Sequence, residues 1–150
     1  MAPVDVTSEI EVARRRTEVA AYAIDPDHAA EWSVSVTGVL WLTPPPLTVG
    51  SRLAFTSRLL GSPLEYAYEV RELEPEVRFV MATDEGPFPM ETTYAWRDAP
   101  DGTTVMTLRS HGEPAGFSKV SAPLVARAVA RAGRKDLRRL KQILEARPGA

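Results

Sequence analysis

The sequence contains no cysteine and only two histidines, His28 and His111. Without cysteine the chain has no disulfide framework, thiolate nucleophile, cysteine-bearing zinc site or iron–sulfur cluster. Two histidines leave little room for a metal centre, so we expect no metal and no other cofactor. The nucleophile elbow, the P-loop, GxGxxG and HExxH are also missing, which excludes hydrolases and nucleotide enzymes that depend on them.

Long apolar runs and an excess of positive charge are missing as well. No apolar run approaches the roughly 18 residues of a membrane-spanning helix, and the N-terminus lacks the apolar segment of a signal peptide. The formal net charge is −2 and the isoelectric point is about 5.7, which argues against nucleic acid as the main partner. We expect a cytoplasmic protein that is a monomer or a homodimer.

The 150 residues are 44% apolar and 25% charged, which is typical of one globular domain. Apolar residues alternate with polar ones in several short segments, as in strands with one solvated face, whereas the C-terminal segment has helical spacing. We leave 1–6 outside the structured core, which we place at about 7–146. The expected strands are 7–14, 36–43, 52–60, 64–73, 77–83, 88–97 and 103–110, and the expected helices are 17–24, 26–32 and about 117–146.

This order of elements predicts an α+β fold. Six or seven strands with short connections form an antiparallel sheet, and a sheet of that width curls. The last helix, about 40 Å long if continuous, is the only element long enough to cover the concave face. Two short helices after the first strand, with Thr17 and Asp25 as candidate N-caps, would close one end.

Five short motifs follow one another along the chain in a fixed order. They are Asp25-Pro26-Asp27-His28 with Glu31-Trp32, Val49-Gly50-Ser51-Arg52, Glu69-Val70 leading to Glu74-Pro75, Gly86-Pro87-Phe88, and Gly116-Phe117 leading to Ala122-Pro123-Leu124. Together they resemble the START-like (SRPBCC) superfamily, in its polyketide cyclase/dehydratase-like branch. The resemblance implies a helix-grip fold with a cavity between sheet and helix. Relatives include lipid carriers, cyclases and hydrolases, so it implies a fold more than an activity.

The chain departs from this branch at Ala20, Ala23 and Ala29, where larger side chains are usual. The missing volume either enlarges the cavity or is refilled by Trp32 and Trp41. An unfilled dry void costs about 24 cal/mol per Å3, so a large cavity would indicate a ligand.

Aromatic and methionine side chains are the candidate ligand contacts. Tyrosine hydroxyls on an apolar face can bond a ligand carbonyl or phenol, although such residues can also simply fill a core. The ligand-binding candidates are Trp41, Phe55, Tyr66, Tyr68, Phe79, Met81, Met90 and Tyr94.

Four residues are candidates for moving a proton: Tyr66, Tyr94, Glu72 and His111. Strict alternation from Val70 points Glu72 inward, unless a bulge precedes the next residue. His111 faces solvent if Ser110 faces the cavity. His28 is expected at the surface, and Arg52 and Arg109 either neutralise an anionic ligand or are simply exposed.

Charge is unevenly distributed, with a net −8 over 1–110 and +6 over 111–150. The last helix can therefore present a basic face to an anionic membrane or an acidic partner, or its charged side can be merely solvated. We favour the binding of a hydrophobic or aromatic molecule, such as a polyketide or fatty acyl compound, in the internal cavity. The alternative is a cyclase/dehydratase acting on a ligand in the same cavity.

Overall fold

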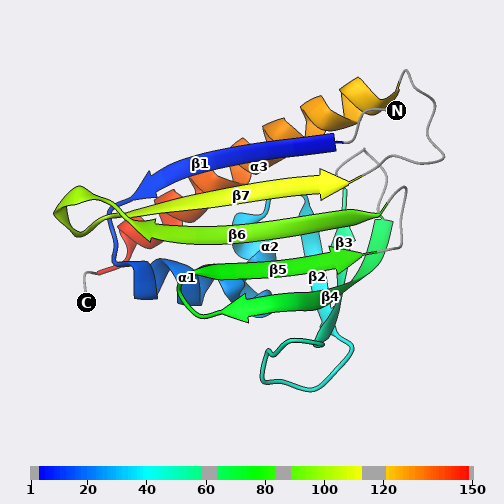
Figure 1. The fold of residues 1–150 in the computed structure, drawn as a ribbon, viewed down its shortest axis with the longest axis horizontal. Coiled ribbons are helices and arrows are strands. Elements are labelled where there is room, and N and C mark those ends of the chain that lie inside the picture. Colours follow the sequence, from blue (N-terminus) through cyan, green and yellow to red (C-terminus); the bar gives the residue numbers. More distant parts are fainter. Residues whose placement is uncertain (1–3, 59–63, 84–88, 113–120, 149–150) are drawn as a thin grey trace.

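The computed structural model describes residues 4–58, 64–83, 89–112 and 121–148, and contains seven strands and three α-helices (Figure 1). The strands are β1 (Val4–Val12), β2 (Val36–Trp41), β3 (Arg52–Ser57), β4 (Leu64–Glu74), β5 (Arg78–Thr83), β6 (Met90–Asp98) and β7 (Thr104–Gly112). The helices are α1 (Arg16–Ile24), α2 (Ala29–Trp32) and α3 (Ser121–Ala146), with short 3-10 turns at Pro26–His28 and Pro100–Gly102.

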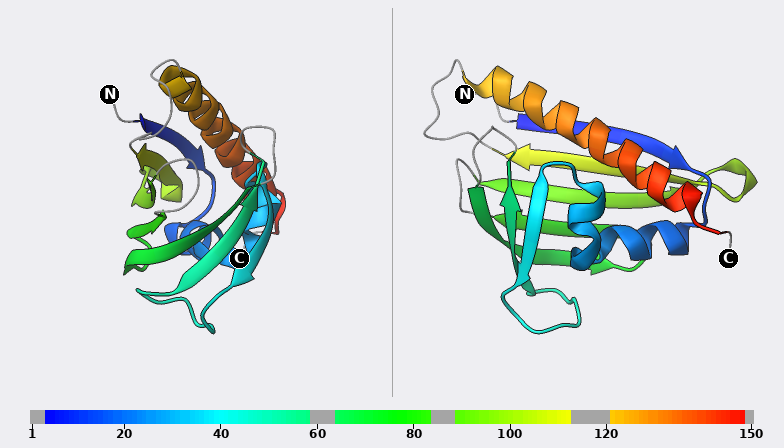
Figure 2. Two further views of the ribbon diagram at one scale, coloured as in Figure 1. Left: turned by 90° about the vertical axis from the view of Figure 1, so that its right-hand side faces the viewer. Right: turned by 180° about the vertical axis from the view of Figure 1, so that it is seen from behind.

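All seven strands belong to one antiparallel sheet in the order β1-β7-β6-β5-β4-β3-β2. Neighbouring strands are consecutive in the chain, except that β1 lies beside β7. Figure 2 shows the sheet curled around α3, with α1 near the C-terminal end of that helix and α2 beside its middle. The α+β helix-grip architecture expected from the order of elements is thus confirmed.

The first strand begins earlier than its alternation indicated. Val4 is already in β1, is fully buried and pairs with Gly112 of β7. The interpretation of 1–6 as a loose end is therefore wrong for the described residues of that segment. The cause is β7, whose nine residues offer backbone partners along the whole length of β1.

The two short helices occur where expected, but one of their predicted caps is wrong. Helix α1 starts at Arg16 with Arg15 as its N-cap, so Thr17 lies inside the first turn and caps nothing. Asp25 does cap, because its side chain accepts a hydrogen bond from the Asp27 N–H at 2.9 Å at the start of the 3-10 turn.

The small alanines at 20, 23 and 29 lie in or beside the main hydrophobic core. Ala20 and Ala23 are buried in the main hydrophobic core, and Trp32 packs there with almost no exposed surface. Ala29 lies at the boundary between this core and a pocket described below. Two of the three small alanines therefore belong to the same packed core as Trp32, whereas the third lies beside the pocket.

A β-bulge interrupts the alternation of β4. The register shifts between Val70, which pairs with Met81, and Glu72, which pairs with Val80. A bulge adds one unpaired residue to a strand, so each side chain after it points to the sheet face opposite the one that strict alternation predicts. Glu72 is therefore turned outward, where it forms an ion pair with Arg78 at 3.2 Å, and the inward orientation given by strict alternation does not occur.

Helix α3 packs along the concave face with a continuous apolar stripe that includes Leu137, Leu140 and Leu144. Pro123 lies in its first turn and does not break it, whereas the predicted helical start at 117–120 lies outside the described residues. A Cβ on Gly133 would lie 3.1 Å from the Ser8 hydroxyl oxygen, so glycine allows α3 to approach β1 closely. Within the described part of the chain, no helix is long and apolar enough to cross a membrane.

Candidate functional site

A pocket of about 170 Å3 lies between the sheet and α3. Strands β3 to β7 form one side, the segment from α2 to β2 a second, and α3 a third. The helix contributes Val125, Val129, Ala132, Gly133 and Asp136, spaced by three or four residues along one face. The walls are mostly apolar, with serine and threonine hydroxyl groups scattered over them: Ser33, Ser35, Ser57, Thr83, Thr92 and Ser110.

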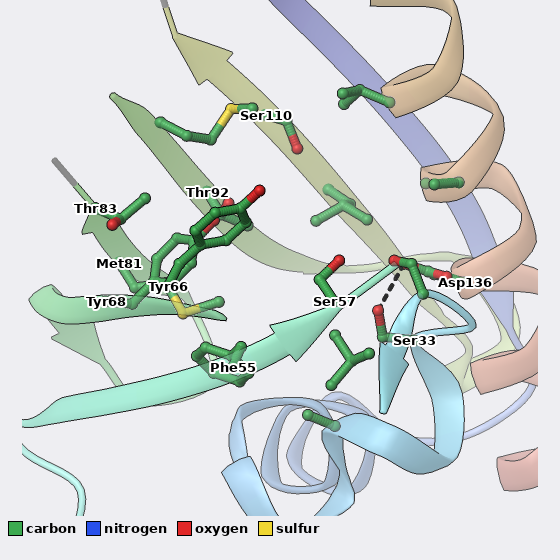
Figure 3. A pocket seen from close by; sticks show the side chains of 18 of the residues that line it. Ser33, Phe55, Ser57, Tyr66, Tyr68, Met81, Thr83, Thr92, Ser110 and Asp136 are labelled. Atoms are coloured by element: carbon green, nitrogen blue, oxygen red, sulfur yellow. Dashed lines mark hydrogen bonds between the residues drawn. The ribbon is translucent and has the colours of Figure 1, made fainter. Parts of the chain in front are cut away.

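Most of the ligand-binding candidates named from the sequence are on this wall. They are Phe55, Tyr66, Tyr68, Met81, Met90 and Tyr94. They meet there because alternation places these side chains on the concave face of adjacent strands. Figure 3 shows Phe55, Tyr66, Tyr68 and Met81 together on the sheet side of the pocket.

Two of the ligand-binding candidates are not on the wall. Trp41 lies at the end of β2 and donates its indole N–H to the Asp27 carboxylate at 2.9 Å. Phe79 is buried in the main core, with its ring centroid 5.5 Å from that of Tyr94. Trp41 therefore ties β2 to the helical turn, and Phe79 supports a tyrosine of the wall from behind.

Two of the proton-transfer candidates, Glu72 and His111, also lie outside the pocket. Glu72 is exposed after the bulge, as described above. His111 pairs in the sheet with Asp5 and Glu91, on the face opposite Ser110, which lines the pocket. The structure thus selects the Ser110 face of β7 for the pocket, and His111 points away from it.

The other basic candidates, His28, Arg109 and Arg52, do not line the pocket either. The His28 ring stacks on Tyr22 with centroids 4.4 Å apart, and its Nδ1 lies 3.1 Å from the Tyr22 carbonyl oxygen. Arg109 forms two hydrogen bonds of 2.8 Å with the Asp5 carboxylate on the outer face of the sheet. Arg52 is exposed at the start of β3.

Among the described wall residues that the sequence analysis did not name as candidates, Asp136 is the one with an ionisable side chain. Its side chain lies on the inward face of α3 and is only 7% exposed. The Ser33 hydroxyl donates to Oδ2 at 3.0 Å, and the Val34 backbone N–H donates to Oδ1 at 2.8 Å. In Figure 3 Asp136 and Ser33 lie together on the helix side of the pocket, across from Tyr66 and Tyr68.

Burial changes the acidity of this carboxyl group. Desolvation raises the pKa of Asp136 from 3.8 to about 6, and the hydrogen bonds from Val34 and Ser33 oppose this rise only in part. A carboxyl group with this pKa exchanges a proton near neutral pH, as a general acid or base must. Asp136 is thus a pocket residue that can exchange a proton near neutral pH, whereas the candidates Glu72 and His111 lie outside the pocket.

The tyrosines on the wall are held in their neutral form. Desolvation raises the pKa of Tyr68 to about 12, with a hydrogen bond to Thr92 acting in the opposite direction. Desolvation likewise raises the pKa of Tyr66, and that of Tyr94, where the negative charge of Asp136 adds to the effect. Neutral phenols can donate or accept a hydrogen bond, so they can orient a polar group of a ligand.

The sequence carries one signal that would have found Asp136. It stands four residues after Ala132 and four before Leu140, in the middle of the apolar stripe. A carboxylate at such a position is buried, because every neighbour on that face packs against the sheet. The serines at 33, 35 and 57 carry no comparable signal, since they belong to turns and strand ends.

Several solved structures have the same fold as this chain. TTHA0849 from Thermus thermophilus matches with a TM-score of 0.81 and 18% identity, covering 96% of this chain and 99% of its own. A START superfamily protein from Mycobacterium smegmatis matches with a TM-score of 0.81 and 15% identity, covering 94% and 97%. The di-domain ARO/CYC BexL from the BE-7585A biosynthetic pathway matches with a TM-score of 0.77 and 18% identity, covering 94% of this chain and 46% of its own.

No curated protein matches the chain. The family model described as polyketide cyclase / dehydrase and lipid transport matches residues 3–145. This match runs from the first strand to the last turn of α3 and includes every wall of the pocket. The START-like resemblance is thereby confirmed, and the chain belongs to the polyketide cyclase/dehydrase and lipid transport family.

Proposed function

We propose that the protein binds a hydrophobic or aromatic small molecule in the pocket between the sheet and α3. The observation that carries this proposal is the pocket itself, a mostly apolar space of about 170 Å3 lined by aromatic and methionine side chains. An engineered apolar cavity of about 150 Å3 is large enough to hold benzene. A space of this size therefore accepts a single ring or an equivalent length of acyl chain.

The composition of the wall supports the same proposal. Ligand pockets combine apolar surface with a few polar groups that fix orientation. Here Phe55, Met81 and Met90 provide apolar contact, while Tyr66 and Asp136 provide polar contacts on opposite sides. Methionine side chains adapt to ligands of different outline, which suits a binding protein.

Filling the pocket from α3 should abolish binding. In Ala132→Phe the new ring occupies space that the ligand needs, so we expect any hydrophobic molecule that copurifies with the wild type to disappear in native mass spectrometry. Binding of the neutral probe 3-phenylpropanol, followed by NMR titration, should weaken at least tenfold.

The matched control for this prediction is Gln142→Phe, which adds the same side chain at an exposed position of the same helix. It should bind 3-phenylpropanol as the wild type does. Equal binding by the wild type and Ala132→Phe would contradict the proposal, as would an empty wild-type protein that does not bind the probe at all.

A cyclase or dehydratase activity is the second candidate, and Asp136 is the observation that favours it. As a carboxylate it can take a proton from an activated carbon of a bound polyketone chain. That carbon can then attack a carbonyl of the same chain, whose oxygen takes up the proton that Asp136 now holds. Loss of the new hydroxyl with a neighbouring proton as water, followed by enolisation, gives the aromatic ring. The pocket has room for about one ring, so it contributes by folding the segment of the chain that closes into that ring.

For this activity we expect Asp136→Asn to reduce turnover of a linear poly-1,3-diketone thioester by about 100-fold or more, since general acid–base groups contribute about that much. Formation of the aromatic product is followed by absorbance. Glu72→Gln and His111→Gln should leave the rate unchanged, because both residues lie outside the pocket. A fully active Asp136→Asn would exclude this role.

A further inference from the structure

We infer that Asp136 sets the charge preference of the pocket, which accepts an apolar molecule whose polar end is a protonated amine or another hydrogen-bond donor and rejects the corresponding carboxylate. This inference rests on the proposed binding function and deepens it. It names which end groups the ligand can carry.

The first observation is the charge on the wall. Asp136 is buried there, and among the described residues that line the pocket there is no lysine, arginine or histidine. The basic side chains next to it on α3 face outward: Lys135 and Arg139 are exposed, and the Arg139 guanidinium bonds the Glu31 carbonyl oxygen outside the pocket. A ligand in the pocket therefore meets one acidic group and no basic group of the described wall.

The second observation concerns the hydrogen bonds to the Asp136 carboxylate. Its two hydrogen-bond partners described above, the Ser33 hydroxyl and the Val34 N–H, are neutral donors, and each bonds a different oxygen. A carboxylate has about four acceptor positions, so two neutral hydrogen bonds leave acceptor capacity. A donor at the end of the ligand fits this capacity, whereas a second carboxylate offers only acceptors.

The charges determine the order of affinities. A protonated amine gains a charge-assisted hydrogen bond in an environment less polar than water, where electrostatic interactions are strong. An alcohol gains a neutral hydrogen bond, and a carboxylate meets charge repulsion and loses its hydration. We therefore expect the affinities to fall in the order amine, alcohol, carboxylate.

The preference depends on pH through Asp136. The titratable groups that share the pocket with it are Tyr66 and Tyr68 from β4 and Tyr94 from β6, and all three have raised pKa values and stay neutral between pH 5 and 8. Neither α2 nor β2, which also pack there, adds an ionisable side chain to the described wall. Protonation of Asp136 at low pH should therefore remove most of the preference.

The experiment compares 3-phenylpropylamine, 3-phenylpropanol and 3-phenylpropanoate, which share one apolar body. Dissociation constants are measured by NMR titration at pH 7.5 and pH 5 for the wild type, Asp136→Asn and Asp101→Asn. The last variant removes one negative charge at the exposed 3-10 turn outside the pocket. It controls for the net charge of the protein.

At pH 7.5 we expect the wild type and Asp101→Asn to bind the amine at least tenfold more tightly than the carboxylate. In Asp136→Asn, and in the wild type at pH 5, this ratio should fall to within about threefold. If the alcohol binds but amine and carboxylate bind equally in the wild type, the charge preference is wrong and the binding function stands. If none of the three binds and native mass spectrometry finds the pocket empty, the binding function fails, and the inference with it.

Discussion

Replacing Leu140 with alanine should lower the free energy of unfolding by about 2–5 kcal/mol, the range measured when a buried leucine is truncated. Leu140 is 0% exposed and stands in the middle of the α3 stripe, packed in the same core as Leu137 and Leu144. The cost combines the lost burial of the side chain with the cavity it leaves. It can be measured by urea unfolding followed by circular dichroism.

The matched control is Leu124→Ala on the same helix. Leu124 is 62% exposed. Its truncation should change stability by less than about 0.5 kcal/mol. Similar losses for the two variants would mean that α3 does not pack on the sheet in the way described.

The second large effect concerns pH. The unfolded chain should release the Asp136 proton near the usual pKa of 3.8, whereas the folded protein holds it to about pH 6. The folded state therefore binds more protons between these values, and the contribution of Asp136 to stability falls as pH rises through this window. At about 1.36 kcal/mol for each pKa unit, the ionised group costs the folded state up to about 3 kcal/mol above pH 6.

Asp136→Asn removes this cost. We expect the difference in unfolding free energy, variant minus wild type, to rise by up to about 3 kcal/mol between pH 4 and pH 7, whatever constant offset the amide introduces at Ser33. Urea unfolding at a series of pH values measures it. A flat difference would show that the carboxyl group is not desolvated.

Glu145→Gln provides a control of opposite sign. Hydrogen bonds from Lys141 and the Ala13 N–H lower the pKa of Glu145, so its ionised form stabilises the folded state. That stabilisation is present above its usual pKa of 4.5 and is lost as pH falls. The two variants should therefore depart from the wild type in opposite directions.

Periodicity predicted the fold well because the sheet has one buried face. Along β6, Tyr94 and Trp96 are buried while Arg97 is exposed, which is the pattern that alternation requires. The local pattern gave a wrong prediction where pairing with a distant strand determines the structure. Val4 was expected outside the core, but it pairs with Gly112, more than one hundred residues away in the chain. It also failed at the β4 bulge, since one unpaired residue leaves no mark in the composition of the strand.

The same alternation predicted part of the candidate site. Tyr66, Tyr68 and Tyr94 could be found because strands display their side chains in a fixed alternation. Asp136 was missed because the sequence analysis considered only the overall charge of the last helix, although the spacing of Asp136 from Ala132 and Leu140 matches the apolar stripe. A charged residue in register with apolar neighbours thus indicates a buried ionisable group, which the residue type alone does not.

The pairing of β1 with β7 has a consequence for the order in which the protein is assembled. During synthesis on the ribosome, β1 emerges before β7, its hydrogen-bonding partner, and before α3, its covering helix, which both follow about one hundred residues or more later. Contacts between such distant segments slow folding, and they leave an early strand edge without a partner. The edge carries Asp5, Glu9 and Glu11, whose like charges discourage pairing between two nascent chains until β7 arrives.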